Sequence, residues 1–183
     1  MRSRREWWAV LAAACLSVLA VIGAGLPLYV FPPAGRVDGA DVIFIIGPVT
    51  SARSAEAEQL RADGVADRIL VSVPADGPPR AAKELCAQDG VECRHPEPFT
   101  TKGEAAMLAA FAEEEGLSRA VVITFTPHVA RTRYIFGHCF DGDATVVGVD
   151  DPLSPVDWIY QYAYQTTAFV KAVVTPCATL EDQ

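Results

Sequence analysis

The most restrictive feature of the sequence is an uncharged apolar segment near its start. No residue from Trp7 to Gly35 is charged, so positions 7 to 35 form a run of 29 residues rich in Ala, Val, Leu and Ile. About 20 such residues suffice to cross a bilayer as a helix. The segment therefore predicts a basic start and one transmembrane anchor in residues 1–35, followed by a separate domain in residues 36–183.

The charges on either side of this segment predict its orientation. Arg2, Arg4 and Arg5 precede the span and only Arg36 follows it closely, and such positive charge normally stays in the cytoplasm. We expect a single-pass plasma-membrane protein with a cytoplasmic N-terminus and an extracytoplasmic domain. A cleaved signal peptide is the alternative, because the small residues at positions 23–25 would suit a peptidase. The exported domain is the same in either case.

The exported part is strongly acidic. Three of the 15 basic residues and one of the 23 acidic residues precede the span, which leaves 12 basic and 22 acidic residues and a net charge of −10. This balance argues against nucleic acid as a partner and against broad adhesion to anionic lipid. A phosphate ligand would need a local basic pocket.

Four cysteines lie outside the span. Cys86, Cys93, Cys139 and Cys177 allow three pairings in an oxidising compartment. We favour Cys86–Cys93, across the turn at residues 89–90, and Cys139–Cys177, which would join the C-terminal tail to a helix end. Four unpaired thiols are the alternative. The spacing is not that of a zinc site, and no metal is expected.

The exported domain alternates strand-like and helix-like segments. Apolar segments predict strands at 42–46, 69–71, 120–123 and 145–147, and Val91-Glu92-Cys93 is a weaker strand signal. The continuous run at 42–46 is typical of a strand buried on both faces. Helical patterns fall at 53–63, 80–87, 103–115 and 127–138, and Ser154-Pro155-Val156-Asp157 opens a last helix that runs to about 174. The alternation predicts an α/β fold with a mainly parallel five-stranded sheet. Trp158, Tyr162 and Phe169 are expected to pack on the sheet or near the membrane.

The segment Thr101-Lys102-Gly103-Glu104 opens one of these helices. Thr101 and Glu104 have the spacing of a capping box, which explains both side chains without a ligand. Gly103 in the first turn is not explained, because glycine costs up to about 1 kcal/mol relative to alanine unless something approaches the backbone closely. The segment is therefore a candidate site.

A second candidate is the turn after the fourth strand. His128 and Arg131 lie three residues apart in a helix expected to begin with Thr126 as cap and Pro127 as first residue, so they share one face. Cations are unfavourable near a helix N-terminus. The pair therefore indicates an anionic partner, either Glu104 in an internal ion pair or a ligand phosphate.

These features, taken in order, resemble the SanA/YdcF/ElyC-like family of bacterial envelope proteins. The resemblance is carried by a strand beginning at Asp41, a helix leading to Asp63-Gly64-Val65-Ala66, the Thr-x-Gly-Glu-Ala helix start and the Val-Ile-Thr…His-x-x-Arg turn. It covers nearly the whole exported domain. It implies a Rossmann-like three-layer α/β/α sandwich behind one N-terminal membrane segment, and a role in envelope integrity or lipid-carrier metabolism.

The resemblance also implies a set of site residues. Its characteristic positions correspond here to Asp41, Arg53, Thr101, Gly103, Glu104, His128 and Arg131. The chain departs from the family at Gly47-Pro48, where the family shows a glycine pair, at Ser72-Val73, where it often shows Ser-Gly, and at Thr132, where it shows alanine. Glycines at these positions let a ligand approach the backbone, so their loss argues against a broad phosphate cradle, although Gly47 is kept as a candidate ligand-binding residue.

Three functions follow as expectations. In the first, the domain binds an anionic envelope metabolite such as a phosphorylated lipid carrier or glycan precursor, through Asp41, Gly47, Arg53, Thr101, Gly103 and Arg131. In the second, it is a hydrolase or transferase acting on a phosphoester or glycan precursor, with His128 as general acid/base assisted by Glu104. In the third, it is a non-catalytic envelope scaffold. No nucleophile motif is visible, and the sequence names no cofactor.

Overall fold

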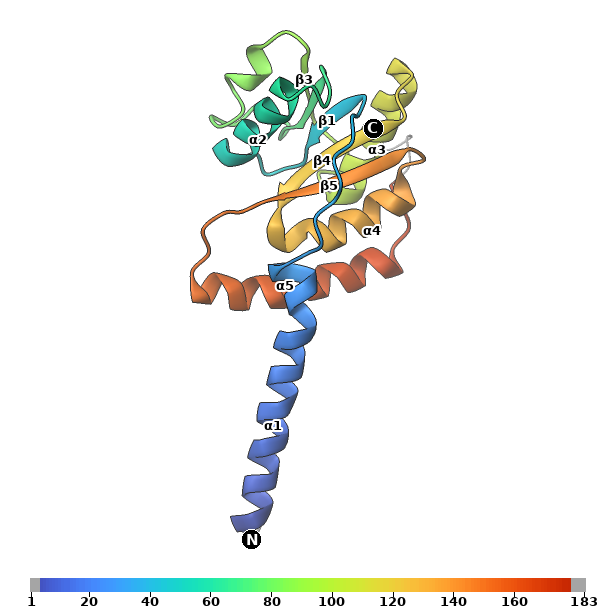
Figure 1. Cartoon of the computed structure of the whole chain (residues 1–183). Coiled ribbons are helices and arrows are strands. Elements are labelled where there is room, and N and C mark those ends of the chain that lie inside the picture. The colour runs from blue at the N-terminus through green and yellow to red at the C-terminus, as the bar shows by residue number, and fades with distance from the viewer. Residues whose placement is uncertain (1–3, 179–183) are drawn as a thin grey trace.

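A computed structural model describes residues 4–178. A long N-terminal helix, α1 (Arg4–Gly25), and a π-helical turn, η1 (Leu26–Val30), project from an α/β domain (Figure 1). Residues Arg4–Val30 form the one helical segment in the described chain that is long and apolar enough to cross a membrane, with a mean hydropathy of 2.4, and almost none of it is buried in the domain. Signal sequences share this length and hydropathy, so the retained anchor and its orientation stay predictions.

The domain contains a five-stranded sheet in which all the strands are parallel. The strand order is β3-β2-β1-β4-β5, and the strands are β1 (Val42–Ile45), β2 (Ile69–Ser72), β3 (Val91–Arg94), β4 (Arg119–Phe125) and β5 (Asp143–Val149). β1 lies in the centre and pairs with β2 and β4. The continuous apolar runs of β1, β2 and β4 follow from burial on both faces.

Helices cover both faces of this sheet and complete three layers (Figure 1). α2 (Ser51–Ala62) packs on one face, and α3 (Thr101–Glu115) and α4 (Val129–Cys139) pack on the other. Val42 and Phe44 point into the core on the α3 and α4 side, while Ile43 and Ile45 point to the α2 side. The predicted Rossmann-like α/β/α sandwich behind an apolar helix is the fold that the structure shows.

The helix predicted at 80–87 is wrong. Only a short 3-10 turn, η2 (Leu85–Ala87), forms there. Eight residues are too few to be helical without help from packing, and the disulfide between Cys86 and Cys93 holds this turn against β3. A second 3-10 turn, η3 (Thr126–His128), precedes α4, so α4 starts at Val129 and not at Pro127 as the sequence indicated.

The last helix, α5 (Pro155–Val174), lies outside the three layers. Ser154 caps it in the predicted capping box with Asp157. Phe169 contacts Tyr134 of α4, with ring centroids 5.3 Å apart, and Tyr162 contacts Tyr29 of η1 at 5.2 Å. These two rings therefore pack on helices and not on the sheet, which corrects that part of the expectation. The sheet face was already covered by α3 and α4, so α5 packs on α4 as a further layer (Figure 1).

Both predicted disulfides are confirmed. Cys86 is bonded to Cys93 and Cys139 to Cys177, with Cα–Cα distances of 5.9 Å and 5.5 Å. The second bond joins the end of α4 to the chain after α5. Cys15, exposed on α1, is the free cysteine.

Removing each disulfide should destabilise the protein to a different degree. The bonded residues are 38 apart in Cys139–Cys177 and 7 apart in Cys86–Cys93, and the entropic model gives about 4 and about 2.5 kcal/mol respectively. Chemical denaturation of the detergent-solubilised full chain with both partners of one bond changed to alanine measures these losses. Equal losses, or free thiols at all four positions of the exported protein, would contradict the assignment.

Candidate functional site

A large cavity lies at the carboxyl ends of the strands. It has a volume of about 1370 Å³ and is bounded by Gly47 and Pro48 after β1, Phe125 and His128 after β4, the start of α3, and one side of α5. The chain leaves β1 toward β2 on one side and later returns to β4 on the other, so the strand order reverses between β1 and β4. Open parallel sheets bind ligands at such a reversal point, which makes this cavity the candidate site.

Glu104 is buried at the base of the cavity. Its Oε1 accepts a hydrogen bond from the backbone N–H of Gly47 at 2.6 Å. Burial raises the pKa of the Glu104 carboxyl to about 7, although that hydrogen bond and the charges of Arg131 and Arg53 act in the opposite direction. Glu104 therefore exchanges a proton near neutral pH.

The predicted capping box of Thr101 and Glu104 is wrong. Thr100, in an extended conformation, is the N-cap of α3, and its hydroxyl accepts the N–H of Gly103 at 3.2 Å. Thr100 and Thr101 can both act as an N-cap. Because Thr100 takes this position, Glu104 is four residues after the cap, whereas a capping box needs a carboxylate three residues after it. Its carboxylate points to β1 instead, so Glu104 needs a reason other than capping.

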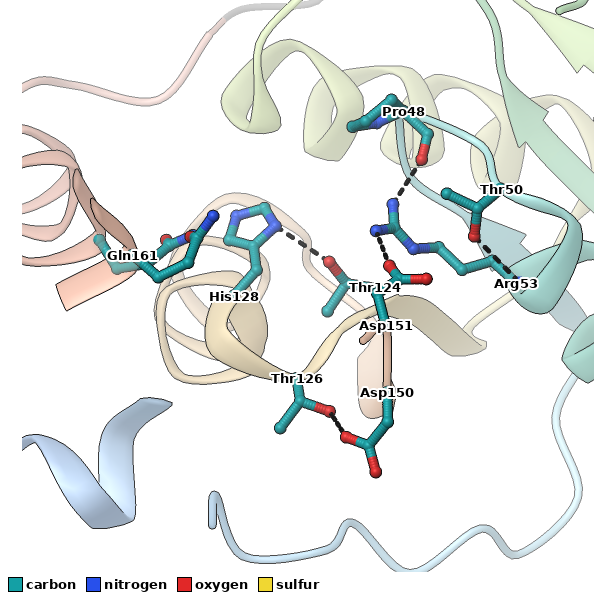
Figure 2. A network of polar contacts seen from close by, with 10 residues as sticks. Pro48, Thr50, Arg53, Thr124, Thr126, His128, Asp150, Asp151 and Gln161 are labelled. Atoms are coloured by element: carbon teal, nitrogen blue, oxygen red, sulfur yellow. Dashed lines mark hydrogen bonds and ion pairs between the residues drawn. The ribbon is translucent and has the colours of Figure 1, made fainter. Parts of the chain in front are cut away.

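His128 is buried beside this carboxyl-end edge and is neutral. Its Nδ1 shares a hydrogen bond of 2.9 Å with the hydroxyl of Thr124, at the end of β4 (Figure 2). Burial, followed by the charges of Arg131 and Arg53, holds the pKa of the imidazole well below its usual value. This corrects the expectation of a second cation. Nε2 is buried without a hydrogen-bond partner, so it remains available to a ligand.

Arg131 has no carboxylate partner within ion-pair distance among the described residues. Its Nε donates to Oε1 of Gln165 at 3.1 Å, its Nη1 lies 3.5 Å from the Thr101 hydroxyl, and its guanidinium stacks over the Tyr164 ring at 5.8 Å. The internal Glu104–Arg131 ion pair considered from the sequence does not form. Burial lowers the pKa of Arg131, but a guanidinium stays charged in proteins. Its charge is thus left for another partner.

Arg53, by contrast, is neutralised within the protein. This buried side chain comes from α2 and forms an ion pair with Asp151 at 3.0 Å, and its Nη1 donates to the Pro48 carbonyl (Figure 2). Its guanidinium also stacks over Phe125 at 5.3 Å. Arg53 therefore holds the end of β1 and the segment after β5 together, and its Nε is a buried donor with no partner.

Asp41 does not lie at the site, which corrects its assignment as a ligand-binding residue. It precedes β1, at the opposite edge of the sheet from the cavity. Its carboxylate accepts the backbone N–H groups of Ser118 and Arg119, both at 2.9 Å, and pairs with the Arg119 guanidinium at 3.2 Å. The two N–H groups lower its pKa. Asp41 fixes the start of β1 to the start of β4, which is a structural role.

Gly103 is likewise explained by packing. A Cβ atom built on it would lie 1.9 Å from the carbonyl oxygen of Pro98, in the loop before α3. The close approach that the sequence predicted is thus made by the protein's own backbone and not by a ligand. Thr101 and Gly47 do border the cavity, as predicted.

The contribution of α5 to the cavity was not predicted from the sequence. Gln165 is buried and joins Arg131 to Gln161 through hydrogen bonds of 3.1 and 3.0 Å, and Gln161 lies on the side of His128 away from Thr124 in Figure 2. The sequence does place Gln161 and Gln165 four residues apart, on the same side of the helix as Trp158 and Phe169, and this spacing could have indicated that both face the domain. Residues 4–178 contain no group of three or more side chains that could hold a metal ion.

Comparison of the chain with protein-family models, curated proteins and solved structures gave no match. The resemblance to SanA/YdcF/ElyC-like proteins therefore remains a prediction.

Gly103→Ala should destabilise the protein. The added methyl group would meet the Pro98 carbonyl, and overpacking of this kind costs about 1–3 kcal/mol. Gly137→Ala in α4 is the matched control, because nothing lies within 4 Å of its Cβ position and alanine is favoured in helices by up to about 1 kcal/mol. Chemical denaturation should show opposite changes. Two stabilised variants would contradict the packing explanation of Gly103.

Glu104→Gln should change how stability depends on pH. The folded-state pKa of about 7 lies above the ordinary value of 4.5, so the folded protein binds the additional proton. The contribution of Glu104 is therefore fully present below pH 4.5 and is lost as the pH rises through 7, by about 3 kcal/mol. Relative to Glu104→Gln, the wild type should lose stability over this interval. The exposed Glu113→Gln on α3 is the control and should follow the wild type.

Proposed function

We propose that this chain is a membrane-anchored extracytoplasmic protein that binds an anionic envelope metabolite in the cavity at the carboxyl ends of β1 and β4. The observation that carries the proposal is Arg131, a largely buried cation whose contacts are all with the neutral groups of Gln165, Thr101 and Tyr164. The Glu104 carboxyl acts on this cation only beyond ion-pair distance and has a pKa of about 7, so the buried charge lacks a close counter-charge, which is costly. A ligand anion would supply that counter-charge.

The chemistry around Arg131 favours a phosphate group. A planar guanidinium binds phosphate oxygens through paired N–H groups. The unpartnered Nε2 of the neutral His128 could donate a further hydrogen bond, provided that Nδ1 accepts from Thr124. The volume of about 1370 Å³ leaves room for more than a phosphate, as a phosphorylated lipid carrier or glycan precursor requires.

A hydrolase or transferase acting on a phosphoester or glycan precursor is the second candidate, and a specific observation favours it. Glu104 has a pKa of about 7 and His128 is kept neutral, and such shifts toward opposite protonation states are characteristic of acid–base pairs in active sites. In this reading, Glu104 donates a proton to the leaving group and Nε2 of His128 accepts one from the attacking group.

Arg131→Ala should weaken the binding of a polyprenyl phosphate. With farnesyl phosphate as probe and detergent-solubilised full chain, titration calorimetry should show a loss of about 10-fold or more, because a hydrogen bond to a charged group contributes roughly 1.5–3 kcal/mol. Arg133→Ala, on the same helix, removes the same charge, but its guanidinium donates to the carbonyls of Pro33 and Val146 outside this cavity. It should bind like the wild type.

Farnesol, which lacks the phosphate, is the second control. Equal affinity for farnesol and farnesyl phosphate would contradict an anion site at Arg131. Inorganic phosphate released during the same titration would indicate the enzyme, provided that His128→Asn abolishes the release while binding is retained.

A further inference from the structure

The outer side of α5 is apolar along its whole length. The exposed residues on this side are Val156, Ile159, Ala163, Thr166, Val170, Val173 and Val174, and Tyr160 and Thr167 lie where it meets the cavity. Val156 and Ile159 are 73% exposed, Val170 is 59% exposed and Val174 is 74% exposed. The charged residues of α5 are Asp157 and Lys171, each within four residues of a helix end. A contiguous apolar face of this kind marks an interaction surface.

The two threonines on this face do not make it polar. The hydroxyl of Thr166 donates to the Tyr162 carbonyl at 2.6 Å, and that of Thr167 donates to the Ala163 carbonyl at 2.9 Å. Both hydroxyls are therefore satisfied by the backbone of α5 itself. Their methyl groups remain to meet an apolar environment.

The rest of the domain surface has almost no comparable side chains. Within residues 4–178, the large hydrophobic side chains that are exposed lie on α1, η1 and Phe31, on α5, or at the single position Phe99. The protein thus has two apolar elements, α1 and α5, on an otherwise acidic domain.

These two elements meet. The Tyr162 ring of α5 lies against Gly25, where a Cβ atom would be 2.1 Å from the ring, and its hydroxyl donates to the Ile22 carbonyl at 3.2 Å. The Tyr29 hydroxyl is hydrogen-bonded to that of Thr166 at 2.9 Å. Figure 1 shows α5 lying across the end of α1, with α1 extending away from the domain on that side.

The position of this contact along α1 determines how deep α5 would lie relative to a bilayer that α1 spans. The helix from Trp7 to Gly25 rises by roughly 27 Å at 1.5 Å per residue, close to the hydrocarbon thickness of about 30 Å. If α1 spans the bilayer, then α5 lies at its boundary and parallel to its surface. This is the depth at which amphipathic helices bury an apolar face.

We propose that α5 is an interfacial membrane helix. Its outer face, from Val156 to Val174, inserts into the headgroup and acyl boundary of the leaflet on the domain's side, and its inner face forms a wall of the cavity. The bilayer is favoured over a second copy of the chain because the apolar face continues from the transmembrane helix at the same level. The proposal does not depend on which ligand the cavity takes.

Site-specific fluorescence on the full chain tests this proposal. In a Cys15→Ser background, Ile159→Cys and Val170→Cys are labelled with an environment-sensitive fluorophore after reconstitution into phosphatidylcholine vesicles. Ala55→Cys, exposed on α2, is the matched control. Lipids carrying a shallow spin label should quench the two α5 labels severalfold more than the control label, and aqueous iodide should quench them severalfold less. Because phosphatidylcholine carries no net charge and the proposed insertion is apolar, added salt should not change the quenching by lipid.

The opposite result is equally clear. If iodide reaches the labels on α5 as readily as the label at position 55, the face is in water and the proposal is wrong. If the α5 labels are shielded from iodide but not quenched by lipid, and cross-link to one another, the face joins two copies of the chain and the proposal is also wrong. Retention of both disulfides shows that the labelled variants are folded.

Discussion

The arrangement of the cavity depends on one buried hydrogen bond, from the backbone N–H of Gly47 to Glu104. It joins the end of the central strand β1 to the first turn of α3, the helix that brings the chain back across the sheet. Loss of either partner would leave a buried polar group unpaired at a cost of a few kcal/mol. Both arginines of the cavity contact residues next to this hydrogen bond. Arg53 donates to the carbonyl of Pro48, which follows Gly47, and Arg131 lies against Thr101, in the same turn of α3 as Glu104.

The helix α5 is held at both ends. Its first turn is closed by the capping box of Ser154 and Asp157. At the other end, the Lys102 ammonium donates to the carbonyls of Ala172 and Pro176, at 2.8 and 2.9 Å, where a cation is favoured by the helix dipole. Lys102 is the neighbour of Thr101, so the residues that open α3 also position the helix that closes the cavity.

The sequence predicts the scaffold better than the site, for physical reasons that particular residues illustrate. The run at 42–46 identifies a buried strand because every position in it is apolar, and the two cysteine pairs fit a short turn and a link between the C-terminal tail and a helix end. The roles predicted for Gly103 and Asp41 were wrong because both residues contact backbone atoms. Gly103 lies against the Pro98 carbonyl, and Asp41 accepts two backbone N–H groups at the start of β4. Such contacts cannot be recognised from the types of the residues involved. The neutrality of His128 depends on burial, and the role of Gln165 depends on which side of α5 meets α4. Both are properties of tertiary packing.

The charges of the proposed site favour a ligand that arrives along the membrane. An anion approaching through water would meet a domain with a net charge of −10, which opposes its encounter with the cavity. Inside, Arg131 attracts the anion, and Glu104 can become neutral by taking up a proton because its pKa is already about 7. An anionic headgroup carried by a lipid would avoid the acidic surface if α5 lies in the bilayer boundary, since Tyr164 and Lys171 of that helix border the same cavity. The membrane surface and the anion site would then lie on opposite sides of α5.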